Sequence, residues 1–101
     1  MLFLTLLELQ AQNIVKGVVL DGDSEEPLQN VVISVKENLL VSTVTTNDGV
    51  FILKDLSNGD YILEIKLAGY ETQNFPLELS GTTIDLEEIY MFQDVTEDQD
   101  L

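Results

Sequence analysis

The strongest constraint on the fold of this chain is an alternation of apolar and more polar residues with a period of two. The apolar row falls on the odd-numbered positions of four segments: residues 31–35, 51–53, 61–67 and 75–79. A strand with this pattern presents one apolar face to a core and one more polar face to solvent, as half-buried antiparallel strands require. No stretch shows the apolar spacing of a helix. The alternation therefore predicts an all-β protein.

Turn-forming residues separate these segments and mark further strands. The acidic stretch 21–27 follows a first strand at residues 14–20, and two more strands are expected at residues 40–46 and 84–92. Asn47-Asp48-Gly49 and Asn58-Gly59-Asp60 tolerate the positive φ of tight turns, so they predict β-hairpins. About seven strands, with a turn roughly every eight to twelve residues, predict a seven-stranded antiparallel β-sandwich. It would be immunoglobulin-like or transthyretin-like (prealbumin-like).

Two irregularities refine this prediction. Pro76 lies inside a strand pattern, so that strand should lie at an edge of its sheet or be bulged there. In the last strand the apolar positions change parity, from Ile84 and Leu86 to Ile89 and Met91. This change predicts a bulge or a shift of register between the two pairs.

The composition limits what the chain can bind or catalyse. Its 101 residues fit one domain and include 19 Asp and Glu against 4 Lys, for a net charge of −15 at pH 7. This charge repels nucleic-acid phosphates and anionic lipid headgroups, so neither is an expected partner. The sequence has no His, which removes the commonest general base, the commonest zinc ligand and the middle member of a Ser-His-Asp triad. We therefore expect no enzyme activity and no cofactor, and assign no catalytic, cofactor-binding or metal-binding residue.

The two ends of the chain differ from the alternating region. Residues 1–12 (MLFLTLLELQAQ) are interpreted as a secretory signal peptide truncated at its front, with Leu9-Gln10-Ala11 as the cleavage site. The alternative is an extra strand or helical turn that packs on the domain. The apolar run 2–7 is far shorter than the roughly 20 residues that span a bilayer, so no direct membrane insertion is expected. Residues 93–101 are interpreted as an acidic tail or linker, which leaves residues 13–92 as the sandwich domain.

Several short motifs occur in order along the sandwich region. They are Gly17-x-Val19-x-Asp21, Pro27-Leu28, Thr45-x-x-Asp48-Gly49-x-Phe51, Leu56-x-x-Gly59-x-Tyr61 and Gly69-Tyr70. Together they resemble the carboxypeptidase regulatory-like (peptidase-associated) domain, a transthyretin-like sandwich. Each position also has a structural reading. Gly49 and Gly69 permit tight turns, and Tyr70 is expected to cap the end of the sandwich with its hydroxyl outward.

Within that family, the chain resembles the N-terminal extension of TonB-dependent outer-membrane receptors in Bacteroidetes-type bacteria. The resemblance implies an exported, non-catalytic accessory or interaction module on the periplasmic side of the outer membrane, or at the cell surface. Its partner would be another protein or a neighbouring domain of the same polypeptide. The chain departs from whole receptors because it contains no plug and no barrel. We expect pairing at a free sheet edge to be the mode of interaction, since an added strand needs no special side chains.

Acidic residues offer two candidate metal sites, and both have a simpler reading. Asp21, Asp23, Glu25 and Glu26 are spaced as in a calcium loop, but they lack the glycine and the final glutamate of an EF-hand, which favours a solvated loop. Asp48, Asp55 and Asp60 lie near two turns separated by one strand, so they should lie at opposite ends of the sandwich. Calcium therefore remains only an alternative partner.

Three further hypotheses belong to different functional classes. A carbohydrate- or surface-binding module, which could be calcium-stabilised, would need an exposed aromatic platform, and Tyr70, Tyr90 and Phe92 are its candidates. A cross-linked adhesin repeat is disfavoured because Glu64 points outward and residues 84–92 contain no Asn. A hydroxyisourate hydrolase of transthyretin-like fold would need histidines that the chain lacks.

Overall fold

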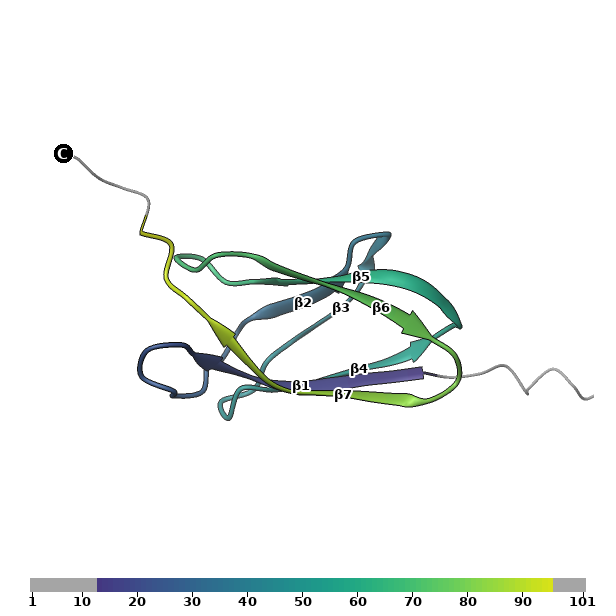
Figure 1. Cartoon of the computed structure of the whole chain (residues 1–101), viewed down its shortest axis with the longest axis horizontal. Helices are drawn as coiled ribbons and strands as arrows, with labels where there is room; N and C mark the ends of the chain where they lie inside the picture. Colours follow the sequence, from purple (N-terminus) through teal and green to yellow (C-terminus); the bar gives the residue numbers. More distant parts are fainter. Residues whose placement is uncertain (1–12, 96–101) are drawn as a thin grey trace, which may run out of the picture.

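The computed structural model describes residues 13–95, which form two β-sheets packed face to face (Figure 1). The interpretation of residues 1–12 as a signal-peptide remnant lies outside the described residues. The strands are β1 (Asn13–Asp21), β2 (Val32–Val35), β3 (Asn38–Val44), β4 (Val50–Leu56), β5 (Gly59–Lys66), β6 (Gln73–Leu79) and β7 (Thr83–Met91). The predicted seven-stranded all-β sandwich is confirmed. Residues 13–95 contain no helix that could cross a membrane.

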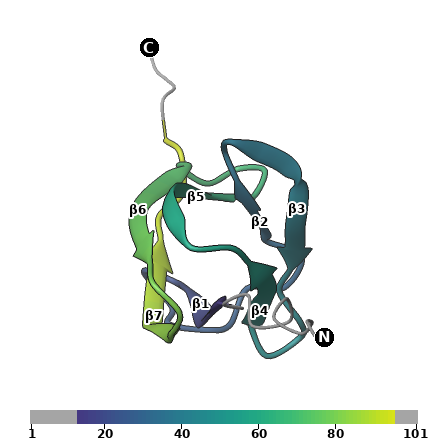
Figure 2. The ribbon, with the colours of Figure 1, turned by 90° about the vertical axis from the view of Figure 1, so that its right-hand side faces the viewer.

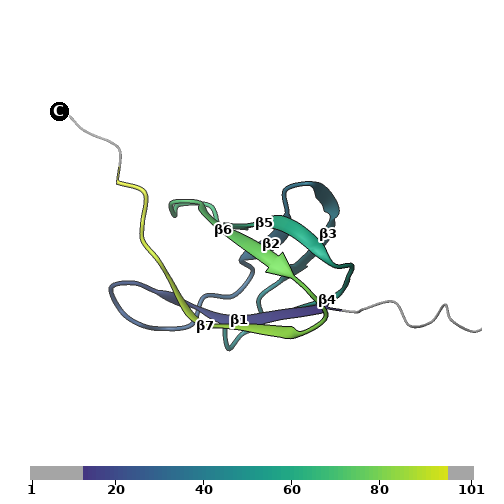
Figure 3. The ribbon, with the colours of Figure 1, turned by 45° about the vertical axis from the view of Figure 1, so that its right-hand side comes forward.

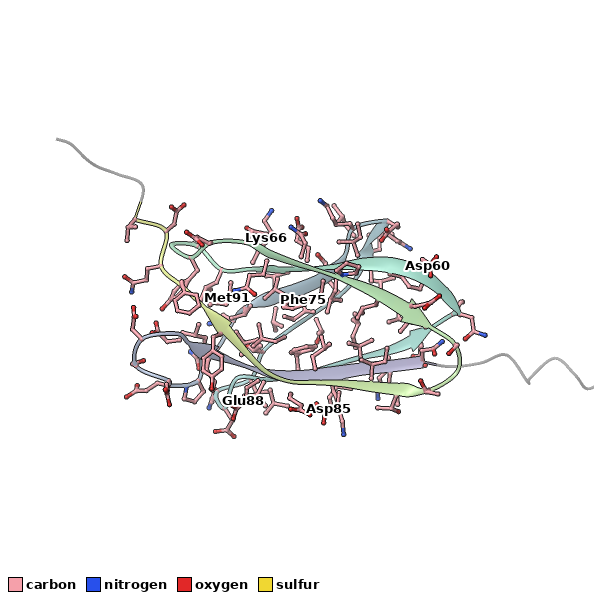
Figure 4. All side chains as sticks on the ribbon, in the orientation of Figure 1. Asp60, Lys66, Phe75, Asp85, Glu88 and Met91 are labelled. Atoms are coloured by element: carbon pink, nitrogen blue, oxygen red, sulfur yellow. The ribbon has the colours of Figure 1, made fainter. Side chains whose placement is uncertain are left out.

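The core between the sheets is built from the odd-numbered rows that the sequence predicted. The rows contribute Val31, Ile33, Val35, Phe51, Leu53, Leu63, Ile65, Leu77 and Leu79, all buried. Their even-numbered neighbours Ile52 and Ile62 are exposed. Side chains fill the space between the two layers, Phe75 among them (Figure 4). Each large apolar side chain buried here contributes roughly 1.5–3 kcal/mol, so this core is the main source of the fold's stability.

The connections at the two glycine turns run between the sheets. One sheet has the order β4-β1-β7 and the other β3-β2-β5-β6, so Asn47-Asp48-Gly49 joins different sheets, and so does Asn58-Gly59-Asp60. The prediction of hairpins at these turns is wrong. Both Gly49 and Gly59 do have positive φ, as the sequence suggested. Such a residue allows a tight reversal, but the sheet that the next strand joins is decided by packing.

The three-stranded sheet departs from the expected antiparallel arrangement in one pair. β1 and β7 run parallel, and their register shifts between Lys16 and Val18 of β1. The extra residue lies in β7 at Glu87, whose φ is 60°. The predicted bulge between Leu86 and Ile89 is therefore confirmed. Parallel strands need a crossover connection, and here all the strands between β1 and β7 in the sequence form it.

After β7 the chain passes the turn between β5 and β6 (Figure 3). Glu71 N–H donates to Phe92 O at 2.9 Å, and Asp94 N–H donates to Gly69 O at 2.9 Å. Backbone pairing with the sandwich thus continues through Asp94, beyond the boundary at residue 92 that the sequence suggested. The acidic character of this segment concealed the pairing, because these two bonds are made by backbone groups, which any residue type carries.

Candidate interaction surface at the sheet edges

Within residues 13–95 the sandwich has four edge strands. β3 and β6 flank the four-stranded sheet, and β4 and β7 flank the three-stranded sheet. Figure 2 shows the two layers from one end, with β3 and β6 at opposite sides of the upper layer. Edge strands carry N–H and C=O groups that lack ladder partners and can pair with another chain. The residues along each edge therefore decide where a partner strand can be added.

Pro76 protects the edge at β6. It lies opposite Ile62 of β5. The carbonyl of Ile62 accepts a hydrogen bond from Lys36 N–H at 2.9 Å, so the backbone of Ile62 faces β2 and the backbone of Pro76 faces the open side. Proline has no N–H to offer there, and the next outward residue, Glu78, adds a charge. The expected edge position of the Pro76 strand is confirmed.

Bulges that carry acidic residues interrupt the edges at β4 and β7. In β4 the register with β1 shifts beside Lys54 and Asp55, and Asp55 has a φ of 63°. In β7 the bulged residue Glu87 donates its N–H to Asp85 Oδ1 at 2.9 Å. A bulge turns the backbone away from regular pairing, and a charged side chain resists burial in an interface. Both edges are therefore poor sites for an added strand.

The edge at β3 carries neither a charge nor a proline. Its sequence is NLLVSTV (Asn38–Val44), and we call this segment the β3 edge. The β3 edge is also irregular, because Leu39–Val41 have no partner residues in β2. This irregular stretch contains leucines, whereas the bulges of β4 and β7 contain acidic residues. The side chains of Leu39 and Leu40 are 64% and 92% exposed. Exposed apolar residues on an uncharged edge favour pairing with another chain.

Ser42 and Val44 present their backbone groups to the open side of the β3 edge. Thr45 N–H donates to Val31 O at 3.0 Å, so odd-numbered residues of this segment face β2 and even-numbered residues face away. The side chain of Val44 is 52% exposed on the outer face of the sheet, beside Val32. The β3 edge thus combines outward N–H and C=O groups with a small apolar surface.

A second feature, at the end of the sandwich where β1 finishes, is a hydrogen-bonded Asp21. Its Oδ2 accepts the hydroxyl of Tyr70 at 2.5 Å, and its Oδ1 accepts the N–H groups of Asp23 at 2.8 Å and Ser24 at 3.0 Å. These bonds, that from Tyr70 first, lower the pKa of Asp21. The same bond raises the pKa of Tyr70. The expectation that the Tyr70 hydroxyl points outward is wrong, because the carboxylate of Asp21 lies within its reach.

Both ends of this contact belong to the motifs that suggested a family. The sequence profile of the CarboxypepD_reg-like domain matches residues 15–97. The chain belongs to this family. The match covers most of the chain and includes the glycine turns, Asp21 and the Gly69-Tyr70 pair. No protein with a curated function matches the sequence.

Solved structures resemble this regulatory-like domain at low sequence identity. A chain of a C-terminal interface mutant of the type II cohesin–X-dockerin complex from Acetivibrio cellulolyticus has a TM-score of 0.69 and 20% identity, covering 80% of this chain and 58% of that one. BcpA, the major pilin subunit of Bacillus cereus, has a TM-score of 0.64 and 14% identity, covering 83% and 31%. The Bacillus anthracis TIE protein has a TM-score of 0.62 and 18% identity, covering 82% and 17%. The domain therefore spans only part of each of these chains, and the likeness is one of fold.

The structure leaves two of the three aromatic residues proposed for a carbohydrate platform exposed. Tyr70 is half-buried and hydrogen-bonded to Asp21. Tyr90 donates its hydroxyl to Glu88 Oε1 at 2.8 Å, a bond that raises the pKa of Tyr90. The ring of Phe92 lies directly on Gly22, where it leaves no room for a side chain, and remains 48% exposed. Only Tyr90 and Phe92 are therefore available to a ligand.

The acidic candidates do not form a metal site in the described residues. Gly49 O accepts a hydrogen bond from Val19 N–H, near the end of β1. Asn58 Oδ1 accepts a hydrogen bond from the side chain of Asn13, at the start of β1. The turns that carry Asp48 and Asp60 thus lie at opposite ends of the sandwich, as expected. Within residues 13–95 no three potential metal-binding side chains gather in one place. Glu64 lies on the outer face, where its Oε1 is 4.0 Å from Lys66 Nζ.

The sequence did not predict two features of this surface. The Asp21–Tyr70 bond joins residues far apart in the chain, and only their shared membership of the family motifs hinted at it. The β3 edge had a clearer signal. It is a charge-free run of seven residues in a chain that is 23% charged. Strand patterning alone could not show that this run lies at an edge.

Proposed function

We propose that this domain is a non-catalytic protein-interaction module of an exported bacterial protein, and that it binds through the β3 edge. The observation that carries the proposal is the contrast among the four edges. β6 has Pro76, and β4 and β7 have acidic bulges, whereas the β3 edge has exposed leucines and outward backbone groups. Natural sheets protect edges that should remain unpaired, so an unprotected edge is a candidate binding site.

Family membership supports the same proposal and suggests a setting. The family resemblance favours the periplasmic N-terminal domain of a TonB-dependent nutrient receptor, or a position at the cell surface. Similar folds occur in a cohesin–X-dockerin complex and in a pilin subunit. The partner would be a separate protein or a neighbouring domain of the same polypeptide.

Affinity capture from an outer-membrane extract tests this function. The wild-type chain, immobilised, should recover a specific protein, and the Ser42→Pro variant should not, because proline removes an outward N–H from the β3 edge. Asn74→Pro is the matched control, since Asn74 is an exposed residue with an outward N–H on the edge at β6. Equal recovery by all three proteins, or recovery of nothing specific, would count against the proposal.

Carbohydrate or surface binding is the second candidate function, favoured by one observation. Phe92 and Tyr90 remain 48% and 36% exposed next to the acidic loop after β1. Exposed aromatic rings can stack on sugar rings, and carboxylates can accept hydrogen bonds from hydroxyls. A glycan array should then show binding that Phe92→Ala abolishes. An array without specific hits would remove this candidate.

A further inference from the structure

The β3 edge has a charge environment different from that of the rest of the molecule. The chain as a whole carries −15, but the strands and turns around the β3 edge contain nearly balanced charges: Lys36, Glu37, Asp48, Lys54 and Asp55. The opposite side is acidic. Strands β6 and β7 carry Glu78, Asp85, Glu87 and Glu88 and no lysine. A basic partner would therefore be attracted to the β6 and β7 side, and the β3 edge suits a partner whose contacting surface carries little net charge.

We infer that the β3 edge pairs with the β3 edge of a second copy of this chain, antiparallel and across a two-fold axis. This inference rests on the proposed function and names the partner at the same site. A two-fold interface must be self-complementary, so that each residue contacts its partner in both directions. The β3 edge meets this condition, because the same strand supplies both donors and acceptors.

The backbone directions specify the register. Ser42 and Val44 both point their N–H and C=O groups outward, and the register that pairs both residues of each copy places Ser42 of one copy opposite Val44 of the other, and the reverse. Each of these pairs exchanges two hydrogen bonds, as hydrogen-bonded antiparallel pairs do. The two Thr43 residues then lie at the axis. Both four-stranded sheets become one continuous sheet, with Val44 adding apolar contact on its outer face.

Charge repulsion does not oppose this arrangement at the contact. Pairing at the β3 edge brings the balanced sides of the two copies together and leaves the acidic strands β6 and β7 on the outside. Charges separated by more than a Debye length, about 8 Å at physiological ionic strength, are largely screened. Pairing through β6 or β7 would instead bring the acidic sides into contact.

The pairing is short, and the dimer should be weak. Thr46 N–H donates to Val50 O at 3.0 Å, so the open stretch ends where the chain turns toward β4. At its other end, Leu40 N–H is already occupied by Asn38 Oδ1 at 3.1 Å. The contact therefore buries much less than the roughly 1,200 Å² of a stable interface, and we expect a dissociation constant on the order of 0.1 to 1 mM.

Sedimentation equilibrium of the full chain tests the inference at protein concentrations up to about 1 mM. The wild-type chain and Asn74→Pro should dimerise, and Ser42→Pro should remain monomeric while keeping its β-sheet circular dichroism. In the wild-type chain, amide exchange at Ser42 and Val44 should slow as concentration rises, while exchange at Asn74 should not. A monomeric wild-type chain, or a dimer unaffected by Ser42→Pro, would overturn the inference.

A charge-pair experiment tests the register independently. In the proposed dimer, Ser42→Glu and Val44→Lys place the new side chains directly across the interface from one another when both are present. The double variant should dimerise about tenfold more tightly than either single variant, as expected for two added cross-strand ion pairs. No gain in the double variant would contradict the register and with it the inference. If the chain is monomeric but captures a membrane-extract protein through Ser42, self-pairing fails and the proposed function stands.

Discussion

At the scale of single residues, Asn13 joins two connections of the sandwich to β1, and its side chain is completely buried. Its Nδ2 donates to Leu56 O at 2.8 Å and to Asn58 Oδ1 at 3.0 Å. Its Oδ1 accepts the N–H groups of Gly81 at 2.6 Å and Thr82 at 3.1 Å. One amide thus uses its full hydrogen-bonding capacity, joining β1 to the β4–β5 and β6–β7 connections.

Replacing Asn13 with alanine should lower the free energy of unfolding by about 2–4 kcal/mol, because buried backbone groups lose their partners. Urea denaturation of wild type and variant measures the difference. Asn74→Ala, at an exposed position on β6, is the control and should change stability by less than about 0.5 kcal/mol. Equal effects at the two positions would show that the buried network adds little.

The Tyr70–Asp21 bond makes stability depend on pH in a definite direction. The bond holds the pKa of Asp21 below its ordinary value of 3.8. A carboxyl with a depressed folded-state pKa contributes stability that is present above its unfolded pKa and lost as the pH falls through the folded pKa. Tyr70→Phe should therefore be less stable than wild type at pH 7, and the difference should shrink below about pH 4.

Thermal melts of wild type and Tyr70→Phe between pH 7 and pH 2 measure this difference. Because the other acidic residues are the same in both proteins, the comparison isolates the effect of Asp21. The raised pKa of Tyr70 adds an alkaline test. The contribution from neutral Tyr70 is present below its ordinary pKa of 10.0 and is lost as the pH rises through its folded pKa. A difference in melting temperature that is constant with pH would contradict the role assigned to this bond.

At the scale of elements, the sequence predicted the strands and their core faces well. The parity change before Ile89 revealed the bulge at Glu87, and Pro76 revealed an edge, because both are consequences of strand geometry within a few residues. The sequence correctly predicted turns at Gly49 and Gly59 but wrongly predicted that these turns close β-hairpins. Local residues determine a reversal of the chain, whereas the pairing of β1 with β7 depends on residues about 70 apart. The β3 edge was hidden for the same reason.

Gly49 shows why a connection between sheets needs glycine. Its φ is 76°, and a Cβ atom there would lie 2.5 Å from Val19 O. Gly69 has a similar φ of 87° but open space around it. Gly69→Ala should therefore lose only about 1–2 kcal/mol of stability to backbone strain, and Gly49→Ala should lose about 1–3 kcal/mol more from the clash. Chemical denaturation compares the two variants, and equal losses would contradict the steric argument.

Pro76→Val tests the protection of the β6 edge. Valine restores an N–H that faces the open side, so the variant should keep its folded stability but associate or aggregate more readily than wild type. Light scattering during incubation near the melting temperature measures this. Asn74→Val adds a β-branched apolar residue to the same edge without adding an N–H, and it should associate less. Equal association of the two variants would mean that the added apolar surface, and not the N–H, is responsible.

At the scale of the whole molecule, charge repulsion dominates the electrostatics. The chain has 19 acidic residues and only 4 lysines to offset them, and the ion pair between Lys66 and Glu64, at 4.0 Å, is long and exposed on the lysine side. Salt screens repulsion among exposed like charges. Raising NaCl from about 10 mM to about 0.5 M should therefore raise the melting temperature by about 2–5 °C. A decrease would show that attractive pairs matter more than repulsion.

Calcium should act on this molecule only as part of that general screening. Both oxygens of Asp21, the first ligand of the suggested calcium loop, already accept hydrogen bonds from Tyr70 and from two backbone N–H groups. Binding a cation there would have to break those bonds. CaCl₂ and MgCl₂ at equal ionic strength should then give melting temperatures within about 1 °C of each other, and EDTA should change neither beyond its own ionic strength. A calcium-specific rise that EDTA reverses would show that the loop rearranges to bind the ion. Tyr70→Phe would strengthen such binding, because it frees Asp21 Oδ2 for the metal.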